Sequence, residues 1–284
     1  MNHAGTILRE SMANGAVVCP GAWNGLIAKT IAKTGFDACY VSGGATANSV
    51  GYPDTGLITM DDMCRKTQEV VSASGLPVIA DADTGFGDDD SVAQTIKKYD
   101  QSGAAGMHIE DQEFPKRCGH LDGKTLISQD EMVQKISIAS DSRLNDDFIL
   151  IARTDAYSVE GMQAAVDRGN AYREAGADMI FPEGLSDEEA FETFAQGCEG
   201  LLLANMTEFG KTPHITTERF DSMGYNIVIF PVTMQRVAMG AVTHCLTQLR
   251  KEGTAEGFQD KMQTRQDLYD LLGYEPGALW EPTK

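Results

Sequence analysis

The stretch PVIADADTG, residues 77–85, joins a short apolar run to two aspartates and a glycine. Its first half indicates a strand buried on both faces, because the apolar residues are continuous rather than alternating with polar ones. Its second half places Asp81 and Asp83 at the point where such a strand would end. The stretch therefore predicts a buried parallel strand with acidic side chains at its carboxyl end.

The same pattern recurs along the chain. Further short runs rich in Val, Ile, Leu and Ala lie at 16–23, 37–44, 104–112, 147–156, 178–184, 201–206 and 226–232. Helix-like segments such as 91–103 and 160–176 lie between most of them, and the second ends at a glycine that suits a helix C-terminus. Eight buried strands alternating with helices predict a (β/α)₈ barrel; a doubly wound open sheet is the alternative, and eight regular units fit closure better.

No linker, low-complexity tract or shift in composition divides the 284 residues. We therefore expect one barrel domain over residues 1–284, with a C-terminal helical region over 234–284. The six cysteines include no CxxC pair, which is typical of reduced thiols in a cytoplasm. No apolar run reaches the length of a membrane span, so a soluble cytoplasmic protein is expected.

The formal net charge of −19 limits the partners of the protein. It argues against binding to nucleic acid or to an anionic membrane, because both are polyanions. It does not exclude a small anionic substrate, since a few local cations and a metal ion reverse the field inside one cleft.

Polar residues follow almost every predicted strand. They are Ser42, Gly43 and Gly44, then Asp81 and Asp83, Glu110 and Asp111, Arg153 and Asp155, Glu183, and Asn205. A single polar residue at a strand end can simply mark where the chain leaves the core. In a barrel, however, all these ends meet at one mouth, which is where barrel enzymes build their active sites. The pattern favours an active site at that mouth.

Three of these residues, Asp81, Asp83 and Glu110, come from neighbouring predicted strands. The spacing of Asp81 and Asp83 would put both on one face of a strand. Carboxylates that converge in a cleft need a cation, and oxygen ligands without histidine suit Mg²⁺, or Mn²⁺, better than zinc. Asp54, in the loop GYPDTG, would add a fourth carboxylate. The alternative is that these acids pair with Lys and Arg across the rim, although few cations flank them in the sequence.

The cations predicted at the mouth are Arg153, Arg236, Lys116 and Arg117. Arginine binds carboxylates with two parallel hydrogen bonds, so a small di- or tricarboxylate substrate is expected. The segment 42–44 offers a hydroxyl and unhindered backbone amides for a second carboxylate, or forms only a tight turn.

Cys118 lies in the segment PKRCGHLDGK, between Lys116, Arg117 and His120. Cationic neighbours favour the reactive form of a thiol, which predicts a proton donor or a nucleophile rather than an inert buried cysteine. Glycines on either side suit a mobile lid. His120 is either a proton partner or a residue that holds the loop, and Lys124, which closes the segment, is expected to be solvated.

These motifs resemble one family. The matching segments are YVSGG, GYPDTGLITMDD, DADTGFGD, HIEDQ, PKRCGH, ARTDA, FPEG, LLANMTEFGKTP and MQTR, in family order from about residue 16 to 275. The chain resembles the isocitrate lyase and phosphoenolpyruvate mutase superfamily. It is most similar to a small bacterial branch, the 2-methylisocitrate lyases and the 2-alkylmalate (dimethylmalate) lyases.

The resemblance implies a (β/α)₈ barrel, usually a homotetramer, in which the helix after strand eight packs on a neighbouring subunit. It also implies Mg²⁺ held by Asp54, Asp81, Asp83 and Glu110, in part through water. In this family the 2-hydroxyl and a carboxylate of the substrate chelate the metal and a base removes the hydroxyl proton. The bond between carbons two and three then breaks, and a 2-oxo acid leaves.

The resemblance further implies roles for individual residues. Cys118 would protonate the resulting carbanion, and Tyr40 matches a tyrosine that serves as base or electrophile. The positions that match substrate-binding residues are Ser42, Gly43, Gly44, Lys116, Arg117, Gly119, Arg153, Glu183, Asn205 and Arg236.

One segment departs from the pattern of methylisocitrate lyases, which continue KRCGH with RPNK. Here LDGK follows, with Leu121 in place of an extra arginine. The form CGHxxGK resembles alkylmalate lyases and oxaloacetate-cleaving members, whereas MQTRQDLY near the C-terminus is similar to methylisocitrate lyases. Phosphonomutase or phosphonate hydrolase chemistry on the same barrel is an alternative, disfavoured by Cys118, and a non-catalytic binder of small anions is another.

Overall fold

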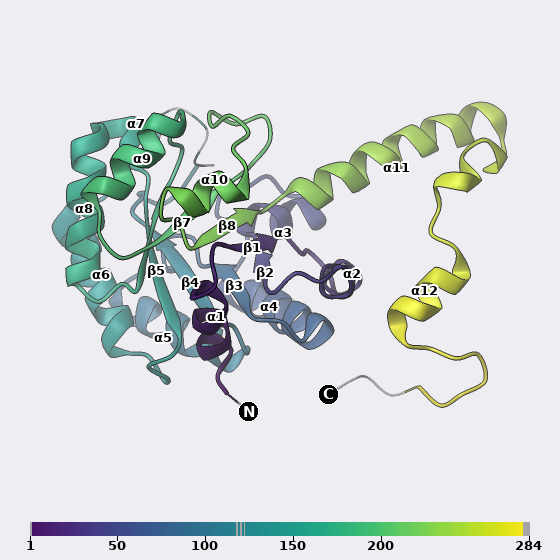
Figure 1. The fold of residues 1–284 in the computed structure, drawn as a ribbon, viewed down its shortest axis with the longest axis horizontal. Helices are drawn as coiled ribbons and strands as arrows, with labels where there is room; N and C mark the ends of the chain where they lie inside the picture. Colours follow the sequence, from purple (N-terminus) through teal and green to yellow (C-terminus); the bar gives the residue numbers. More distant parts are fainter. Residues whose placement is uncertain (1, 118, 120, 122, 281–284) are drawn as a thin grey trace.

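The computed structural model describes residues 2–117, 119, 121 and 123–280. It forms a (β/α)₈ barrel, as Figure 1 shows. The strands are β1 (Val17–Pro20), β2 (Cys39–Val41), β3 (Val78–Asp81), β4 (Gly106–Glu110), β5 (Ile149–Thr154), β6 (Met179–Pro182), β7 (Leu201–Asn205) and β8 (Ile227–Phe230).

The strands are parallel and follow one another around the barrel in sequence order, with β1 paired to β8. The remaining seam, between β1 and β2, is bridged just beyond β1, where Gly21 pairs with Tyr40. There the amide of Ala22 donates to the Tyr40 carbonyl at 2.8 Å. The sheet is therefore closed, which confirms the predicted barrel over the open-sheet alternative.

The continuous apolar runs are explained by burial on both faces of the strands. Side chains such as Tyr40, Ile79 and Phe181 point into the barrel and form one buried cluster with Leu8 from α1 (Ala4–Met12). The alternate side chains pack outward against the helices in a second cluster. Every residue of β3, β4 and β5 is buried, so neither face of these strands is exposed to solvent.

Helices connect the strands around the outside of the barrel. They are α2 (Gly25–Thr34), α3 (Gly43–Ser49), α4 (Met60–Ser74), α5 (Asp89–Gln101), α6 (Gln129–Asp141), α7 (Tyr157–Glu160), α8 (Met162–Glu174), α9 (Glu188–Gly197) and α10 (Thr217–Ser222). Helix α5 begins two residues before the predicted segment because the Asp88 side chain accepts from the Ser91 amide. Gly161, at φ 92°, separates α7 from α8, so the predicted helix over 160–176 begins later than expected.

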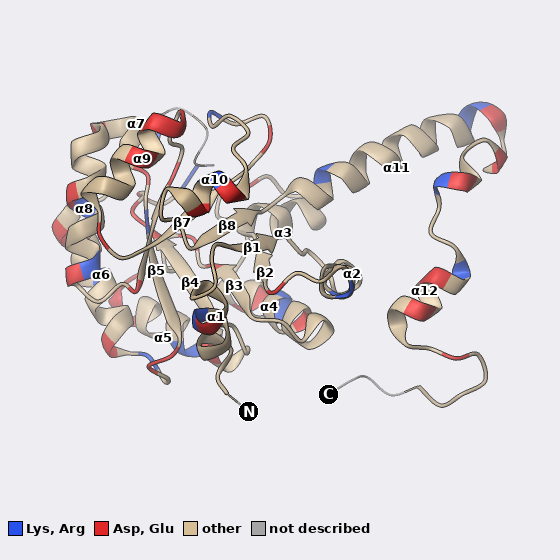
Figure 2. Ribbon diagram, in the orientation of Figure 1, with Lys and Arg blue, Asp and Glu red and all other residues tan. Residues whose placement is uncertain are grey.

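The C-terminal region leaves the barrel. Helix α11 (Thr233–Glu252) projects away from the other helices in Figure 1, and η1 (Glu256–Lys261) and α12 (Arg265–Leu272) follow it. Figure 2 shows that α11 is uncharged along its middle, since no Asp, Glu, Lys or Arg lies between Arg236 and Arg250. In the described part of the chain, no helix combines the length and the hydropathy needed to cross a membrane.

Candidate active site

A cavity of about 160 Å³ lies at the carboxyl ends of the strands. Eleven residues predicted from the sequence line it, namely Tyr40, Ser42, Gly44, Asp54, Asp81, Lys116, Gly119, Arg153, Glu183, Asn205 and Arg236. A neighbouring cavity is larger, about 600 Å³, but among its described lining residues only Asp83 and Lys135 are charged. Of these two cavities, the smaller is the one whose described lining residues include charged groups from several strands, so we locate the candidate site there.

Asp81 is held by backbone amides. Its Oδ2 accepts from the Gly43 amide and its Oδ1 from the Asp83 amide, both at 3.0 Å. Strand β3 ends at Asp81, and Asp83 adopts a φ of 45° in the turn that follows. The expectation that both aspartates share one strand face is therefore wrong. Asp83 reaches the site because the backbone turns after the strand.

The segment 42–44 begins helix α3 rather than forming only a turn. The Ser42 hydroxyl accepts from the Ala45 amide at 3.2 Å and caps the helix. An added Cβ would lie 2.9 Å from Asp81 Oδ2 at Gly43 and 3.0 Å from Asp54 Oδ2 at Gly44. The glycines thus let the start of α3 approach the acids closely.

Lys116 lies between two of the acids. Its Nζ is 2.6 Å from Asp54 Oδ1 and 2.8 Å from Asp83 Oδ1, and its side chain is buried. Burial alone would lower the pKa of Lys116, but the carboxylates of Glu110 and Asp83 outweigh it and raise the pKa well above its ordinary value. Asp54 and Asp83 thus pair with a lysine across the rim, as in the alternative to a metal site that the sequence left open.

Arg153 is surrounded by acids. Its Nη1 lies 3.2 Å from Glu110 Oε2 and 3.5 Å from Glu183 Oε2, and its Nε and Nη2 donate to Asp155 at 2.9 and 3.1 Å. Burial raises the pKa of Glu110 well above its ordinary value despite the charge of Arg153. Burial and the charge of Asp81 raise the pKa of Asp83 to about 6. The site therefore brings together more acids than cations, and the charged forms of Glu110 and Asp83 are disfavoured as long as no cation is added.

The donor set fits a hard divalent cation held in part through water. Glu110 Oε1 is buried and accepts no hydrogen bond from the described residues. No group of three acidic, histidine or cysteine side chains in the described ranges converges closely enough to ligate one ion directly. Carboxylate oxygens joined by water molecules are the usual surroundings of Mg²⁺, and a cation there would relieve the excess charge.

The hydroxyl of Tyr40 lies 2.6 Å from His108 Nε2. His108 is fully buried in β4, and burial lowers its pKa to about 4, so its imidazole is neutral at neutral pH. His108 was not among the site residues predicted from the sequence. Its position two residues before Glu110 could have indicated it, because alternate residues of a strand point to the same side.

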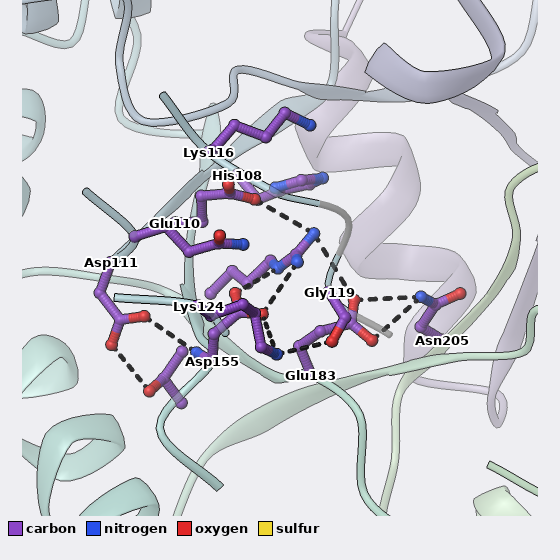
Figure 3. A network of polar contacts seen from close by, with 12 residues as sticks. His108, Glu110, Asp111, Lys116, Gly119, Lys124, Asp155, Glu183 and Asn205 are labelled. Atoms are coloured by element: carbon purple, nitrogen blue, oxygen red, sulfur yellow. Dashed lines mark hydrogen bonds and ion pairs between the residues drawn. The ribbon is translucent and has the colours of Figure 1, made fainter. Parts of the chain in front are cut away.

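Lys124 was expected to be solvated, and the structure contradicts this. Its side chain is wholly buried, with Nζ 2.7 Å from Asp155 Oδ1, and it donates to the Gly119 carbonyl at 2.6 Å. Figure 3 shows Lys124 between Asp155 and Gly119. Nothing in the local sequence signals this, because Asp155 comes from a distant strand end.

The far side of the cavity is built by Arg236 and Asn205. Arg236, in the first turn of α11, donates through Nη1 to the Glu208 carbonyl at 2.6 Å and to Glu208 Oε2 at 2.9 Å. Asn205 donates through Nδ2 to Glu183 Oε2 at 3.1 Å. Glu208, which anchors Arg236, was also not among the site residues predicted from the sequence.

The segment after Lys116 is described only in part. Arg117 is exposed, and its amide and carbonyl pair with the side chain of Gln112 at 3.0 and 2.9 Å. Leu121 is 57% exposed and is not among the described residues that line the cavity. Cys118 and His120 lie outside the described residues, so their roles stay predictions.

The chain is similar to proteins of one enzyme superfamily. The phosphoenolpyruvate phosphomutase family matches residues 8–250. The chain is 47% identical to a probable 2-methylisocitrate lyase of Corynebacterium glutamicum, over 90% of this chain and 84% of the relative. It is 42% identical to the 2,3-dimethylmalate lyase of Eubacterium barkeri, over 97% of this chain and 96% of the relative.

Solved structures agree with these relatives. A crystal structure of 2,3-dimethylmalate lyase has a TM-score of 0.90 at 39% identity, covering 96% of this chain and 92% of that one. Oxaloacetate acetylhydrolase with the inhibitor 3,3-difluorooxalacetate also has a TM-score of 0.90, at 36% identity, covering 95% and 93%. With the matched barrel and the family profile, these similarities make the chain a member of the phosphoenolpyruvate mutase/isocitrate lyase superfamily.

Proposed function

We propose that this protein is a Mg²⁺-dependent lyase that cleaves a 2-hydroxy di- or tricarboxylate, a 2-alkylmalate or 2-methylisocitrate, to pyruvate and a carboxylate. The observation that carries the proposal is the convergence of Arg153, Tyr40 and the carboxylates of Asp54, Asp81 and Glu183 on one small cavity, with Glu110 3.2 Å from Arg153. The enzyme class predicted from the sequence, a carbon–carbon lyase similar to methylisocitrate lyases, is confirmed by the relatives.

The metal would be held by Asp54, Asp81, Asp83 and Glu110, largely through water. When bound, a divalent cation supplies positive charge that polarises the 2-oxygen and a carboxylate of the substrate. A site with more acids than cations repels an anion, so substrate binding is expected to depend on that added charge.

Arg153 would orient a carboxylate of the substrate. Asp155 holds its Nε and Nη2, which leaves Nη1 directed toward the acids at the cavity. A guanidinium fixed in this way binds with little loss of side-chain freedom. Arg236, which Glu208 anchors and which also lines the cavity, would bind a second carboxylate.

Tyr40 and His108 would accept the proton of the substrate's 2-hydroxyl group. The Tyr40 hydroxyl lines the cavity and is hydrogen-bonded to the neutral imidazole behind it. As that proton leaves, the C–O bond of pyruvate gains double-bond character and the electrons of the C2–C3 bond pass to carbon three. Cys118 then donates its thiol proton to the resulting enolate, which completes the product carboxylate.

The proposal is tested by following 2-oxo acid release by the purified protein from 2-methylisocitrate and from 2,3-dimethylmalate. Turnover of at least one of them is expected, with loss of activity in EDTA and recovery on adding Mg²⁺. A Cys118→Ser variant should lose most of its activity because a hydroxyl is a much weaker acid than a thiol. Absence of turnover with both substrates would refute the proposal.

Cleavage of oxaloacetate to oxalate and acetate is the second candidate. It is favoured by Leu121, which replaces a cation next to the predicted acid, and by the structural likeness to oxaloacetate acetylhydrolase. Oxaloacetate should therefore be included in the assay, with oxalate as the product measured. A phosphonate substrate such as phosphonopyruvate covers the third alternative, which gains support only if Cys118→Ser keeps full activity.

We also propose that the protein is a homotetramer in which α11 packs on a neighbouring subunit. Exposed apolar residues lie along this helix, with Val237 at 65%, Met239 at 55%, Val242 at 46% and Leu246 at 59%. A mainly apolar groove of about 510 Å³ lies between α2, α10 and the start of α11, and Ile27, Ile31 and Phe230 are among its lining residues. A helix that follows the last strand of a barrel usually covers such a groove, so a helix from a second copy is expected to cover it here.

A further inference from the structure

Lys124 makes contacts that are unusual for a lysine. Its side chain is 0% exposed, whereas lysine side chains normally end in water. Its ammonium group donates to the Gly119 carbonyl at 2.6 Å and to Asp155 Oδ1 at 2.7 Å. A buried charge costs several kcal/mol unless it is paired and hydrogen-bonded, so these two bonds are what keeps Lys124 inside.

The backbone at Gly119 touches the substrate-binding residues of the proposed site. A Cβ added at Gly119 would collide with Arg153 Nη2 and with Glu183 Cγ. Only a glycine therefore lets the chain lie against this guanidinium without displacing it. Gly119 also directly follows Cys118, the predicted acid, in the sequence.

Asp155 joins the two cations. One of its oxygens accepts from both Lys124 and Arg153 Nη2, and the other accepts from Arg153 Nε. Asp155 is itself fixed, because its amide donates to the buried carboxylate of Asp111 at 2.9 Å. Gly119, Lys124, Asp155 and Arg153 thus form a closed ring of contacts. The first three are labelled in Figure 3.

We propose that Lys124 is a positioning residue for the reaction. By holding the Gly119 carbonyl, it fixes the distance between the backbone next to the acid and the arginine that binds the substrate. This inference rests on the proposed lyase function. It predicts that loss of the ammonium group slows the chemical step while Arg153 continues to bind the substrate.

The first experiment is a double-mutant cycle with Lys124→Met and Gly119→Ala. Lys124→Met should lower kcat by about 100-fold with KM changed less than about threefold, as expected for a misplaced catalytic group. Gly119→Ala should lower kcat by a similar factor and also raise KM, because its Cβ would press on Arg153. If Lys124 acts by holding Gly119 in place, kcat of the double variant should be no lower than that of the worse single variant, because either change already displaces the Gly119 backbone. Multiplied losses in the double variant, or full activity of Lys124→Met, would overturn the proposal.

A matched control separates positioning from stability. Arg143 is also a largely buried cation that binds both a carboxylate, Asp178 at 2.7 Å, and a carbonyl, that of Gly176 at 3.0 Å. It precedes β5 and so lies at the opposite end of the barrel from the cavity. Arg143→Met should lower the unfolding midpoint and leave kcat unchanged. An equal loss of kcat in Arg143→Met at the same folded fraction would show that Lys124 has only a structural role.

The second experiment needs no turnover. Limited digestion with trypsin, followed by mass spectrometry, measures the cleavage rate after Arg117, which is exposed. Lys124→Met should raise that rate at least tenfold relative to the unchanged protein and to Arg143→Met. If the unchanged protein cleaves no candidate substrate but this increase is seen, the lyase proposal fails while the positional role of Lys124 stands. An unchanged rate contradicts the positional role whatever the activity.

Discussion

The hydroxyl oxygen of Tyr40 lies 2.6 Å from Nε2 of His108, and both side chains are buried inside the barrel. Their rings are stacked with centroids 5.9 Å apart, although the residues come from β2 and β4. Burial raises the pKa of Tyr40 well above its ordinary value and lowers that of His108 to about 4. At neutral pH both groups are therefore uncharged and are joined by one hydrogen-bonding proton.

Removing the hydroxyl should slow the chemistry more than binding. We expect Tyr40→Phe to lower kcat by about 100-fold or more, the usual contribution of a positioned acid or base, with little change in KM. Steady-state kinetics with the best substrate measures both. His108→Gln, which can still hydrogen-bond but cannot take up the proton, should show a similar loss of kcat. A Tyr40→Phe variant with normal kcat would exclude the tyrosine as a proton carrier.

Metal binding should depend on Glu110. We expect Glu110→Gln to weaken Mg²⁺ binding at least tenfold, because a charged ligand with a free buried oxygen is lost. Thermal unfolding gives a readout apart from activity, since saturation at about 100 times the Kd stabilises a protein by about 2.7 kcal/mol. At the same Mg²⁺ concentration the unfolding temperature of the variant should rise less than that of the unchanged protein. Equal rises in both would remove Glu110 from the metal site.

The cysteines should differ sharply in reactivity. Burial raises the pKa of the Cys39, Cys64 and Cys198 thiols to about 11 in each case. A thiol reacts as its thiolate, which forms only as the pH rises through the pKa, so at pH 8 about one part in a thousand of these groups is reactive. We expect iodoacetamide at pH 8 to label Cys118 first, and pyruvate with Mg²⁺ to slow that labelling.

Peptide mass spectrometry over time resolves the individual sites, and labelling in urea confirms that all six cysteines can react. Fast labelling of Cys39 in the folded protein would contradict the effect of burial. Labelling of Cys118 no faster than that of a surface thiol would contradict its predicted activation.

The assembly should depend on the apolar face of α11. Val242, Leu246 and Leu249 are spaced along one side of the helix and are 41–59% exposed. A Leu246→Glu variant should shift the protein from a tetramer to a smaller species, measured by light scattering after gel filtration. Val159→Glu, a change at a 45% exposed residue of α7, is the control and should leave the mass unchanged. An unchanged mass for Leu246→Glu would rule out this face as the interface.

A buried ion pair behind the site should carry much of the local stability. Arg168 Nη1 lies 3.4 Å from the buried Asp111 Oδ2 and donates to the Ile127 carbonyl at 3.0 Å. Arg168→Met should destabilise the fold by about 3–5 kcal/mol, because it removes the cation paired with the buried Asp111 and leaves that carboxylate with neutral hydrogen-bond donors such as Thr154 and Tyr172. Urea unfolding measures the loss. Adding Asp111→Asn to this variant should cost less than the sum of the single changes, whereas a simple sum would show that the two residues act independently.

The strands, and the end of the barrel that carries the candidate site, can be predicted from the sequence alone. Each strand is a local run of apolar residues, and burial on both faces requires that run whatever the rest of the chain does. The polar residues at the ends of β3 and β5 could also be predicted from the local sequence, because each directly follows such an apolar run. The mouth of the barrel follows from topology, because parallel strands have all their carboxyl ends on one side.

The contacts between these groups follow from the tertiary structure and not from the local sequence. Lys116, which was predicted to bind the substrate, lies between Asp54 and Asp83. Lys124, which was expected to be solvated, is buried against Asp155. Each pairing joins segments far apart in the chain, and its energy depends on a burial that the local sequence does not encode. The turn that brings Asp83 to the site likewise departs from the regular strand on which the spacing argument relied.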